Sequence, residues 1–215
     1  MKWRRVVGWA CAAAGLAVGA GAWLAFRTPS WWSPPSARPG AVSREDDRAR
    51  ALEQGIAAEL TKVRPSGQRF AMRIRAEDAN AWLALRLPQW LVHDRELPWP
   101  KGVELVQVHA GAPDRLTLAA KRDGVIWSIS VRAVIENGRL RLEPRGGAIG
   151  RLWIPWLGNG GRDDGRGALG IAALVPELAA PTDAILPLPD GRRLRLLDLE
   201  FDGDEARFQF ESMPR

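Results

Sequence analysis

Residues 115–142 have the sequence RLTLAAKRDGVIWSISVRAVIENGRLRL, and this stretch decides the fold. Apolar and polar side chains alternate along it, which is typical of strands that turn one face toward a core. The alternation is interrupted at Asp123-Gly124 and at Asn137-Gly138, and both dipeptides favour the two-residue turns of β-hairpins. The stretch therefore predicts a three-stranded antiparallel meander.

The positions of the two turns also predict how the strands are paired. A turn at 123–124 places Ala120 opposite Trp127, and a turn at 137–138 places Ile135 opposite Leu140. The same register gives the further pairs Leu118 with Ile129, Leu116 with Val131, and Ala133 with Leu142. A shift of one residue would move all of these side chains to the other face of the sheet. We therefore expect one continuous apolar face across the meander.

The rest of the chain predicts helices and strands in separate segments. A helix that begins at Ser43 carries an apolar stripe at helical spacing and ends before Pro65. The remaining predicted elements are a strand over 70–75, a helix over 77–87, a strand over 103–109, a helix over 169–179 and a strand over 194–201. This order indicates an α+β fold, with a curved antiparallel meander packed against two or three helices.

The last predicted strand contains an irregularity. Its apolar phase shifts between Leu196 and Leu197, as a β-bulge would require. A hairpin that turns at residues 203–204 would pair Leu199 with Phe208 and Leu197 with Phe210. A similar phase shift occurs within the strand over 103–109, so we expect two bulged strands.

The N-terminal segment predicts a single transmembrane helix within residues 1–27. The uncharged run from Val6 to Phe26 would span about 30 Å as a helix, the hydrocarbon thickness of a bilayer. Basic residues concentrate before this run, so the positive-inside rule places the N-terminus in the cytoplasm. The expected location is the bacterial cytoplasmic (inner) membrane, with a periplasmic or otherwise extracytoplasmic domain. Four tryptophans are expected at the membrane interfaces: Trp3, Trp23, Trp31 and Trp32.

A cleaved signal peptide is the alternative to a retained anchor. Ala20-Gly21-Ala22 fits the small-x-small pattern of a cleavage site. The apolar run continues past this site through Phe26, and its length favours a retained signal-anchor. Residues 28–42 contain four of the sixteen prolines and predict an extended linker. The extracytoplasmic domain is then expected over residues 43–215.

The charge of the chain does not indicate a nucleic-acid-binding protein. Residues 1–27 contain four of the 31 basic residues and none of the 25 acidic ones, so the formal net charge of +6 falls to about +2 for the rest of the chain. A nearly neutral domain lacks the basic surface that attracts phosphate backbones. The single cysteine, Cys11, lies in the predicted anchor, so we expect no disulfide in the domain.

No motif in the sequence indicates catalysis. Residues 165–170 match G-x-G-x-x-G, but they lack the preceding strand and the βαβ unit that give this pattern meaning. The two histidines, His93 and His109, have no second ligand at the spacing of a metal site. We therefore expect no enzyme, no catalytic residue, no cofactor and no metal.

An apolar run, Leu152-Trp-Ile-Pro-Trp-Leu157, is the most distinctive surface candidate. Such a run is either a buried edge of the core or an exposed patch for a lipid or a protein partner. Tryptophan is enriched at binding hot spots. The candidate apolar-ligand or partner surface consists of Trp153, Trp156, Leu157, Trp90 and Trp99.

The segment RIRAEDANAWL at residues 73–83 resembles part of the YpmS-like membrane-anchored extracytoplasmic proteins. Glu77, Asn80 and Leu83 match the pattern of that family, and Ala76 stands where the family has Ser or Thr. These proteins resemble in turn the TULIP lipid-binding domains, in which a curved antiparallel sheet wraps a helix. The resemblance implies a groove for an acyl chain or another apolar ligand, and no catalysis.

Two hypotheses follow for the function. The first is a non-enzymatic binding module for lipid or another apolar ligand, held at the outer face of the membrane. The second is a structural or accessory subunit that docks onto a larger membrane protein complex through its tryptophan-rich surface.

Overall fold

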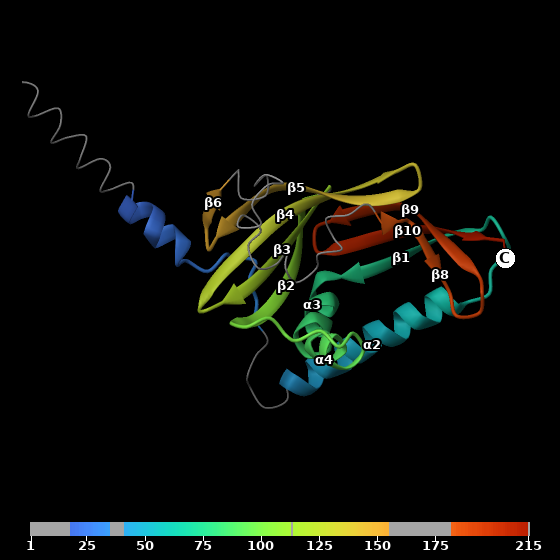
Figure 1. Ribbon diagram of the computed structural model, residues 1–215, viewed down its shortest axis with the longest axis horizontal. Coiled ribbons are helices and arrows are strands. Elements are labelled where there is room, and N and C mark those ends of the chain that lie inside the picture. Colours follow the sequence, from blue (N-terminus) through green and yellow to red (C-terminus); the bar gives the residue numbers. More distant parts are fainter. Residues whose placement is uncertain (1–17, 35–40, 113, 155–181, 215) are drawn as a thin grey trace, which may run out of the picture.

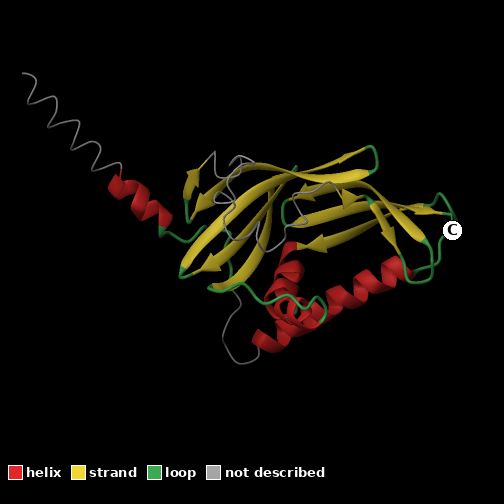
Figure 2. Cartoon of the chain, viewed as in Figure 1, coloured by secondary structure: helices red, strands yellow, loops and turns green. Residues whose placement is uncertain are grey.

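The computed structural model describes residues 18–34, 41–112, 114–154 and 182–214. It is an α+β structure with two antiparallel sheets and with helices beside them (Figure 1; Figure 2), so the predicted fold class is confirmed. The labelled helices are α2 (Ala41–Thr61), α3 (Ala76–Leu85) and α4 (Leu87–His93). The strands are β1 (Arg69–Arg75), β2 (Val103–Ala112), β3 (Arg115–Arg122), β4 (Val125–Glu136), β5 (Arg139–Ile149), β6 (Leu152–Ile154), β7 (Thr182–Asp183), β8 (Ile185–Pro187), β9 (Arg193–Asp202) and β10 (Glu205–Met213).

The larger sheet contains the predicted meander. Its strand order is β2-β3-β4-β5-β6, and β7 also pairs with β5. Asp123 and Asn137 both have positive φ and precede glycines with positive φ, as hairpin turns of the I′ type require. Every predicted pair is observed: Ala120 with Trp127, Leu118 with Ile129, Leu116 with Val131, Ile135 with Leu140, and Ala133 with Leu142. The meander and its register are confirmed.

The smaller sheet has the order β1-β10-β9-β8 and contains the second bulge. Leu199 lies opposite Phe208, as predicted. The prediction that Leu197 lies opposite Phe210 is wrong, because Leu197 is the extra residue of the bulge and Leu196 takes its place in the register. In β2 the extra residue is Glu104, one residue before the phase shift that the sequence shows between Leu105 and Val106.

The two sheets meet at the end of the β4–β5 hairpin. The N–H of Ala184 donates to the carbonyl oxygen of Gly138 at 2.8 Å, and the N–H of Leu196 donates to that of Ala184 at 2.7 Å. Ala184 is buried at this meeting point. A single short segment therefore bonds to the larger sheet on one side and to β9 on the other.

The stretch from Trp90 to Pro100 is aromatic and rich in proline, so the sequence predicts a loop after the helix over 77–87, but this segment begins with the helix α4. Pro88 lies in the first turn of α4. Proline suits this position, because the first helical N–H groups have no partner within the helix and the fixed φ of proline matches the helix. The loop prediction is wrong for Trp90, which lies in α4, whereas Trp99 lies in the irregular segment that follows.

Helices α3 and α4 cover part of the larger sheet beside β2 (Figure 1). Val103, Val106 and Ala120 form a buried cluster there, with Leu87 and Trp99 packed against it. The side chain of Asn80 on α3 also bonds to the backbone of β2, as described below. The sequence RIRAEDANAWL thus forms the end of β1 and most of α3.

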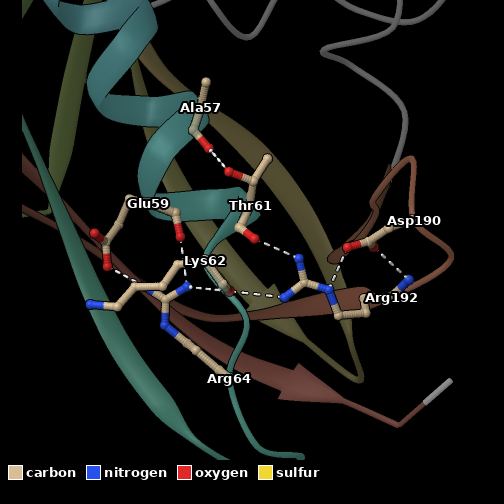
Figure 3. Close-up of polar contacts among 7 residues, drawn as sticks. All are labelled: Ala57, Glu59, Thr61, Lys62, Arg64, Asp190 and Arg192. Carbon is tan, nitrogen blue, oxygen red and sulfur yellow. Dashed lines mark hydrogen bonds and ion pairs between the residues drawn. The ribbon is translucent and has the colours of Figure 1, made fainter.

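Two arginines bind the carboxyl end of α2 (Figure 3). Arg64 donates to the carbonyl oxygens of Glu59 and Lys62 at 2.6 and 3.2 Å, and it also pairs with the Glu59 carboxylate. Arg192 donates to the carbonyl oxygens of Thr61 and Lys62 at 2.7 and 2.8 Å. These carbonyl groups lie at the end of the helix, where cationic groups are favourable. The helix end is therefore capped by one nearby arginine, Arg64, and by one that is distant in sequence, Arg192.

The predicted anchor is described only in its last part. Residues 18–25 are helical. In the ranges that the structure describes, no helix has both the length and the hydropathy needed to cross a bilayer. Residues 1–17 lie outside these ranges, as do residues 35–40 of the predicted linker, the glycine-rich residues 158–167 and the helix predicted over 169–179.

Candidate functional site

Residues 28–34, here called the strap, lie against the larger sheet. Trp32 is only 7% exposed and packs against Ala119 and Ile126. This finding corrects the prediction of a membrane-interface ring at Trp32, because its apolar surface is already buried by the sheet. It also corrects the predicted linker over 28–42, whose first part is bound to the domain rather than free.

The strap is fixed by a buried glutamine of β2. The N–H of Ser33 donates to Oε1 of Gln107 at 3.2 Å, and Nε2 of Gln107 donates to the carbonyl oxygen of Ser33 at 2.5 Å. Gln107 is 2% exposed. One side-chain amide therefore satisfies both backbone groups of Ser33, in the way that a neighbouring strand would.

Trp31 stacks on His109 of β2. The ring centroids are 5.0 Å apart and the planes differ by 2°. Partial burial lowers the pKa of His109 from its ordinary value, because desolvation disfavours the charged imidazolium. Gly111 leaves room for the ring, since a Cβ at that position would lie 2.7 Å from Nε2 of His109. Trp31 was predicted to lie at the membrane interface, and in the structure its ring is half-buried on the sheet.

The turn between β5 and β6 holds the end of the N-terminal helix. The N–H of Arg151 donates to the carbonyl oxygen of Leu24 at 2.9 Å, and its Nε donates to that of Thr28 at 2.8 Å. Gly150 has φ of 56°, and a Cβ there would overlap the backbone of Ala25. The contact therefore requires glycine at this position. We call residues 22–34 together with Gly150 and Arg151 the junction.

Apolar and basic side chains are exposed around the junction. Trp23 is 57% exposed and Phe26 is 77% exposed, and the guanidinium of Arg27 lies 4.3 Å from the centroid of the Trp23 ring. Trp153 on β6 is 47% exposed, and its ring lies over Gly146, where a Cβ would be 2.5 Å from Cζ2 of the tryptophan. The exposure of Trp153 agrees with the surface alternative for this residue.

The other members of the candidate surface lie elsewhere. Trp99 donates from Nε1 to the carbonyl oxygen of Val103 at 2.7 Å and packs on the core cluster beside β2. Trp90 is half-buried, with its ring 6.4 Å from that of Trp82. Since β2 and β6 are at opposite edges of the larger sheet, Trp99 is not brought together with Trp153. Trp156, Leu157 and Trp3 lie outside the described residues.

The two faces of the meander are buried to different extents. Alternation predicts that the apolar face is the buried one, but most of its side chains are only half-buried. On the predicted apolar face, Ala120 and Val131 are buried. The other apolar residues of that face are half-buried: Leu116, Leu118, Trp127, Ile129, Ala133, Ile135, Leu140 and Leu142. On the opposite face the strap covers Ala119 and Ile126, and Ser128 and Ser130 are buried as well. Near the strap the apolar face is therefore the less buried of the two, whereas toward the β4–β5 turn the opposite face is exposed at Arg132, Arg139 and Arg141.

Metal-ligating side chains do not gather in the described part of the chain. No group of three or more His, Cys, Asp or Glu side chains forms a possible metal site there. His109 faces the strap, and His93 ends α4. The G-x-G-x-x-G match at residues 165–170 lies outside the described residues.

Comparisons of the chain with protein-family models, with curated proteins and with solved structures give no match. The junction, with Gln107, is therefore identified as a candidate site from its geometry alone. Sequence reasoning missed three of its residues: Gln107, Gly150 and Arg151. The available signal was weak, because a polar residue within an apolar strand and a glycine before an arginine are both common.

Proposed function

We propose that this protein is a non-enzymatic binding module, anchored in the bacterial cytoplasmic membrane, that holds a lipid or another apolar ligand in the extracytoplasmic space. The observation that carries the proposal is the half-buried apolar face of the meander. Central strands of a sheet normally bury such side chains, and apolar surface that stays open commonly marks a binding site.

The energetics of an acyl chain suit this face. Each methylene group that leaves water contributes roughly 0.8 kcal/mol. The half-buried residues Trp127, Ile135 and Leu140 belong to adjacent strands and share one face. Their side chains offer dispersion contacts and no charge, which favours an apolar chain over a polar substrate.

The membrane location is part of the same proposal. The uncharged run from Val6 to Phe26 supports a retained signal-anchor, with the domain outside the cytoplasm. The resemblance of the segment 73–83 to the YpmS-like proteins supports both the anchor and the apolar ligand. The nearly neutral domain supports neither nucleic-acid binding nor a charged substrate.

Native mass spectrometry of the gently solubilised full chain, followed by solvent extraction, tests this function. We expect bound phospholipid or fatty acid that survives removal of detergent. Ile135→Gln should abolish its retention, because it places an amide on the half-buried face. Arg141→Gln is the matched control, since Arg141 lies on β5 but is exposed. A chain that carries no lipid, or equal retention in both variants, would contradict the proposal.

The second candidate function is an accessory subunit of a larger membrane complex. It is favoured by the exposure of Trp153 on the short strand β6, at one end of the larger sheet. Trp153→Ala should then release a partner protein without changing the melting temperature. A stable lipid-free assembly would favour this candidate over the first, whereas a lipid-loaded monomer would exclude it.

A further inference from the structure

We propose that the junction seats the domain directly on the phospholipid surface in one fixed orientation. The contact patch consists of Trp23, Phe26, Arg27, Arg151 and Trp153. This inference rests on the proposed membrane anchor and adds to it the face of the domain that meets the lipid headgroups.

The end of the N-terminal helix is bonded directly to the turn between β5 and β6. Arg151 binds the carbonyl oxygen of Leu24, which is still within the helical residues 18–25, and also binds that of Thr28. Gly150 approaches Ala25 closely enough to exclude any side chain. The helix end is therefore bonded to the domain before any linker begins, so the domain cannot swivel about that point without breaking these contacts.

The strap attaches the chain to the larger sheet at further points beyond the helix end. Trp31 stacks on His109, Trp32 is buried against the sheet, and Ser33 makes two hydrogen bonds with Gln107. From Leu24 to Ser33, contacts with the larger sheet recur every few residues. Attachment at several separated points fixes an orientation, whereas attachment at one point would only fix a position.

The exposed side chains around the junction are aromatic and basic. Trp23 and Phe26 expose large apolar rings directly beside Arg27. Tryptophan is enriched at the headgroup level of a bilayer, and an arginine there can keep its charge in water while its stem lies along apolar surface. Trp153 follows Arg151 in the sequence and exposes a further ring. The patch therefore suits the surface of a phospholipid bilayer, where anionic phosphate groups lie next to apolar acyl chains.

The proposed orientation makes the two ends of the molecule different. Strand β6 lies beside the end of the N-terminal helix, and the C-terminal end of the chain lies at the far end of the long axis (Figure 1). Ser66 belongs to this far end, because its neighbours Gly67 and Gln68 bond to Ser212. A probe at position 153 should therefore contact headgroups, whereas a probe at position 66 should not.

Fluorescence quenching in vesicles tests the proposal. The full chain with Cys11→Ala carries Trp153→Cys or Ser66→Cys, each labelled with an environment-sensitive fluorophore. The vesicles contain phosphatidylcholine, phosphatidylglycerol and a lipid with a nitroxide on its headgroup. We expect quenching to be several-fold stronger at position 153 than at position 66. Equal quenching at both positions would overturn the fixed orientation.

A glycine pair provides the matched control for the fixed orientation. Gly150→Ala should abolish the difference in quenching, because the methyl group would collide with Ala25. Gly203→Ala places the same methyl group at a φ of 60°, close to the 56° of Gly150, but in open space, and it should keep the difference. If Gly150→Ala leaves the difference intact, the junction does not set the orientation. If far-UV circular dichroism shows that Gly150→Ala is unfolded, Arg151→Gln replaces it, and a difference that Arg151→Gln leaves intact overturns the proposal in the same way.

Co-flotation of the unlabelled chain with vesicles separates this inference from the function on which it rests. A chain that fails to float contradicts the membrane anchor and the seating together. A chain that floats but shows equal quenching retains its anchor and contradicts only the seating.

Discussion

Asn80 bonds to both backbone groups of Val108. Its Nδ2 donates to the carbonyl oxygen of Val108 at 3.0 Å, and its Oδ1 accepts the Val108 N–H at 2.7 Å. Val108 lies in β2, which among the described strands of the larger sheet pairs only with β3. The amide of α3 therefore takes the place of a further strand at this edge, and it ties α3 to the sheet.

Asn80→Asp should lower the free energy of unfolding by about 3 kcal/mol, because a carboxylate can accept from the N–H but would face the carbonyl oxygen with a like charge. Gln89→Glu is the matched change at an exposed position of α4, and it should alter the free energy by less than about 0.5 kcal/mol. Urea unfolding of the full chain in detergent micelles measures both. Similar values for the two variants would mean that the pairing contributes no stability.

Trp32→Ala should lower the free energy of unfolding by about 3–5 kcal/mol, the usual effect of truncating a buried aromatic residue. Trp23→Ala, at an exposed position on the same side of the molecule, should change it by less than about 0.5 kcal/mol. The same unfolding experiment distinguishes them. A small effect of Trp32→Ala would show that the strap is not part of the folded core.

The stability of the domain should fall as the pH falls below about 6.5, the ordinary pKa of histidine. His109 has a lowered pKa in the folded chain because of burial. The unfolded chain therefore binds a proton at a higher pH than the folded chain, and acidification through this window favours unfolding until the folded pKa is reached. His109→Phe keeps an aromatic ring against Trp31 and should remove this pH dependence. Unfolding curves between pH 7.5 and 4.5 (roughly the range that spans the histidine window) measure it, and an unchanged profile in the variant would rule out His109 as the cause.

Arg192→Ala should lower the free energy of unfolding by about 1–2 kcal/mol, because it leaves the carbonyl groups of Thr61 and Lys62 without these donors and removes a cation from the end of α2. Arg193→Ala is the control, since Arg193 is adjacent and exposed. Hydrogen exchange at the last turn of α2 gives a local measurement. Protection that is equal in both variants would show that the arginine does not cap the helix.

The meander could be predicted from the sequence because its information is local. Asp123-Gly124 and Asn137-Gly138 define the turns, and alternation then permits only one register. The bulge at Leu197 was also visible as a shift of apolar phase. The exact partner of Phe210 could not be predicted, because a bulge can place its extra residue on either side of the phase shift.

The candidate site could be predicted only in part. Trp153 was identified from its apolar run and is exposed, but the environment of Trp32 depends on Ala119 and Ile126, which are far from it in sequence. An aromatic residue near a predicted anchor suits a lipid interface and a protein core equally well. The contacts of Gly150 and Arg151 with the helix end have no local signal at all, because both partners are backbone groups.

The strap also has a consequence for the order of folding. Its partners Gln107 and Arg151 follow it by 74 or more residues, so they are synthesised well after it. Contacts of such long sequence separation form slowly. The strap is therefore the last part of the domain to be fixed, and the meander can complete its own local hairpins before the strap docks on the sheet.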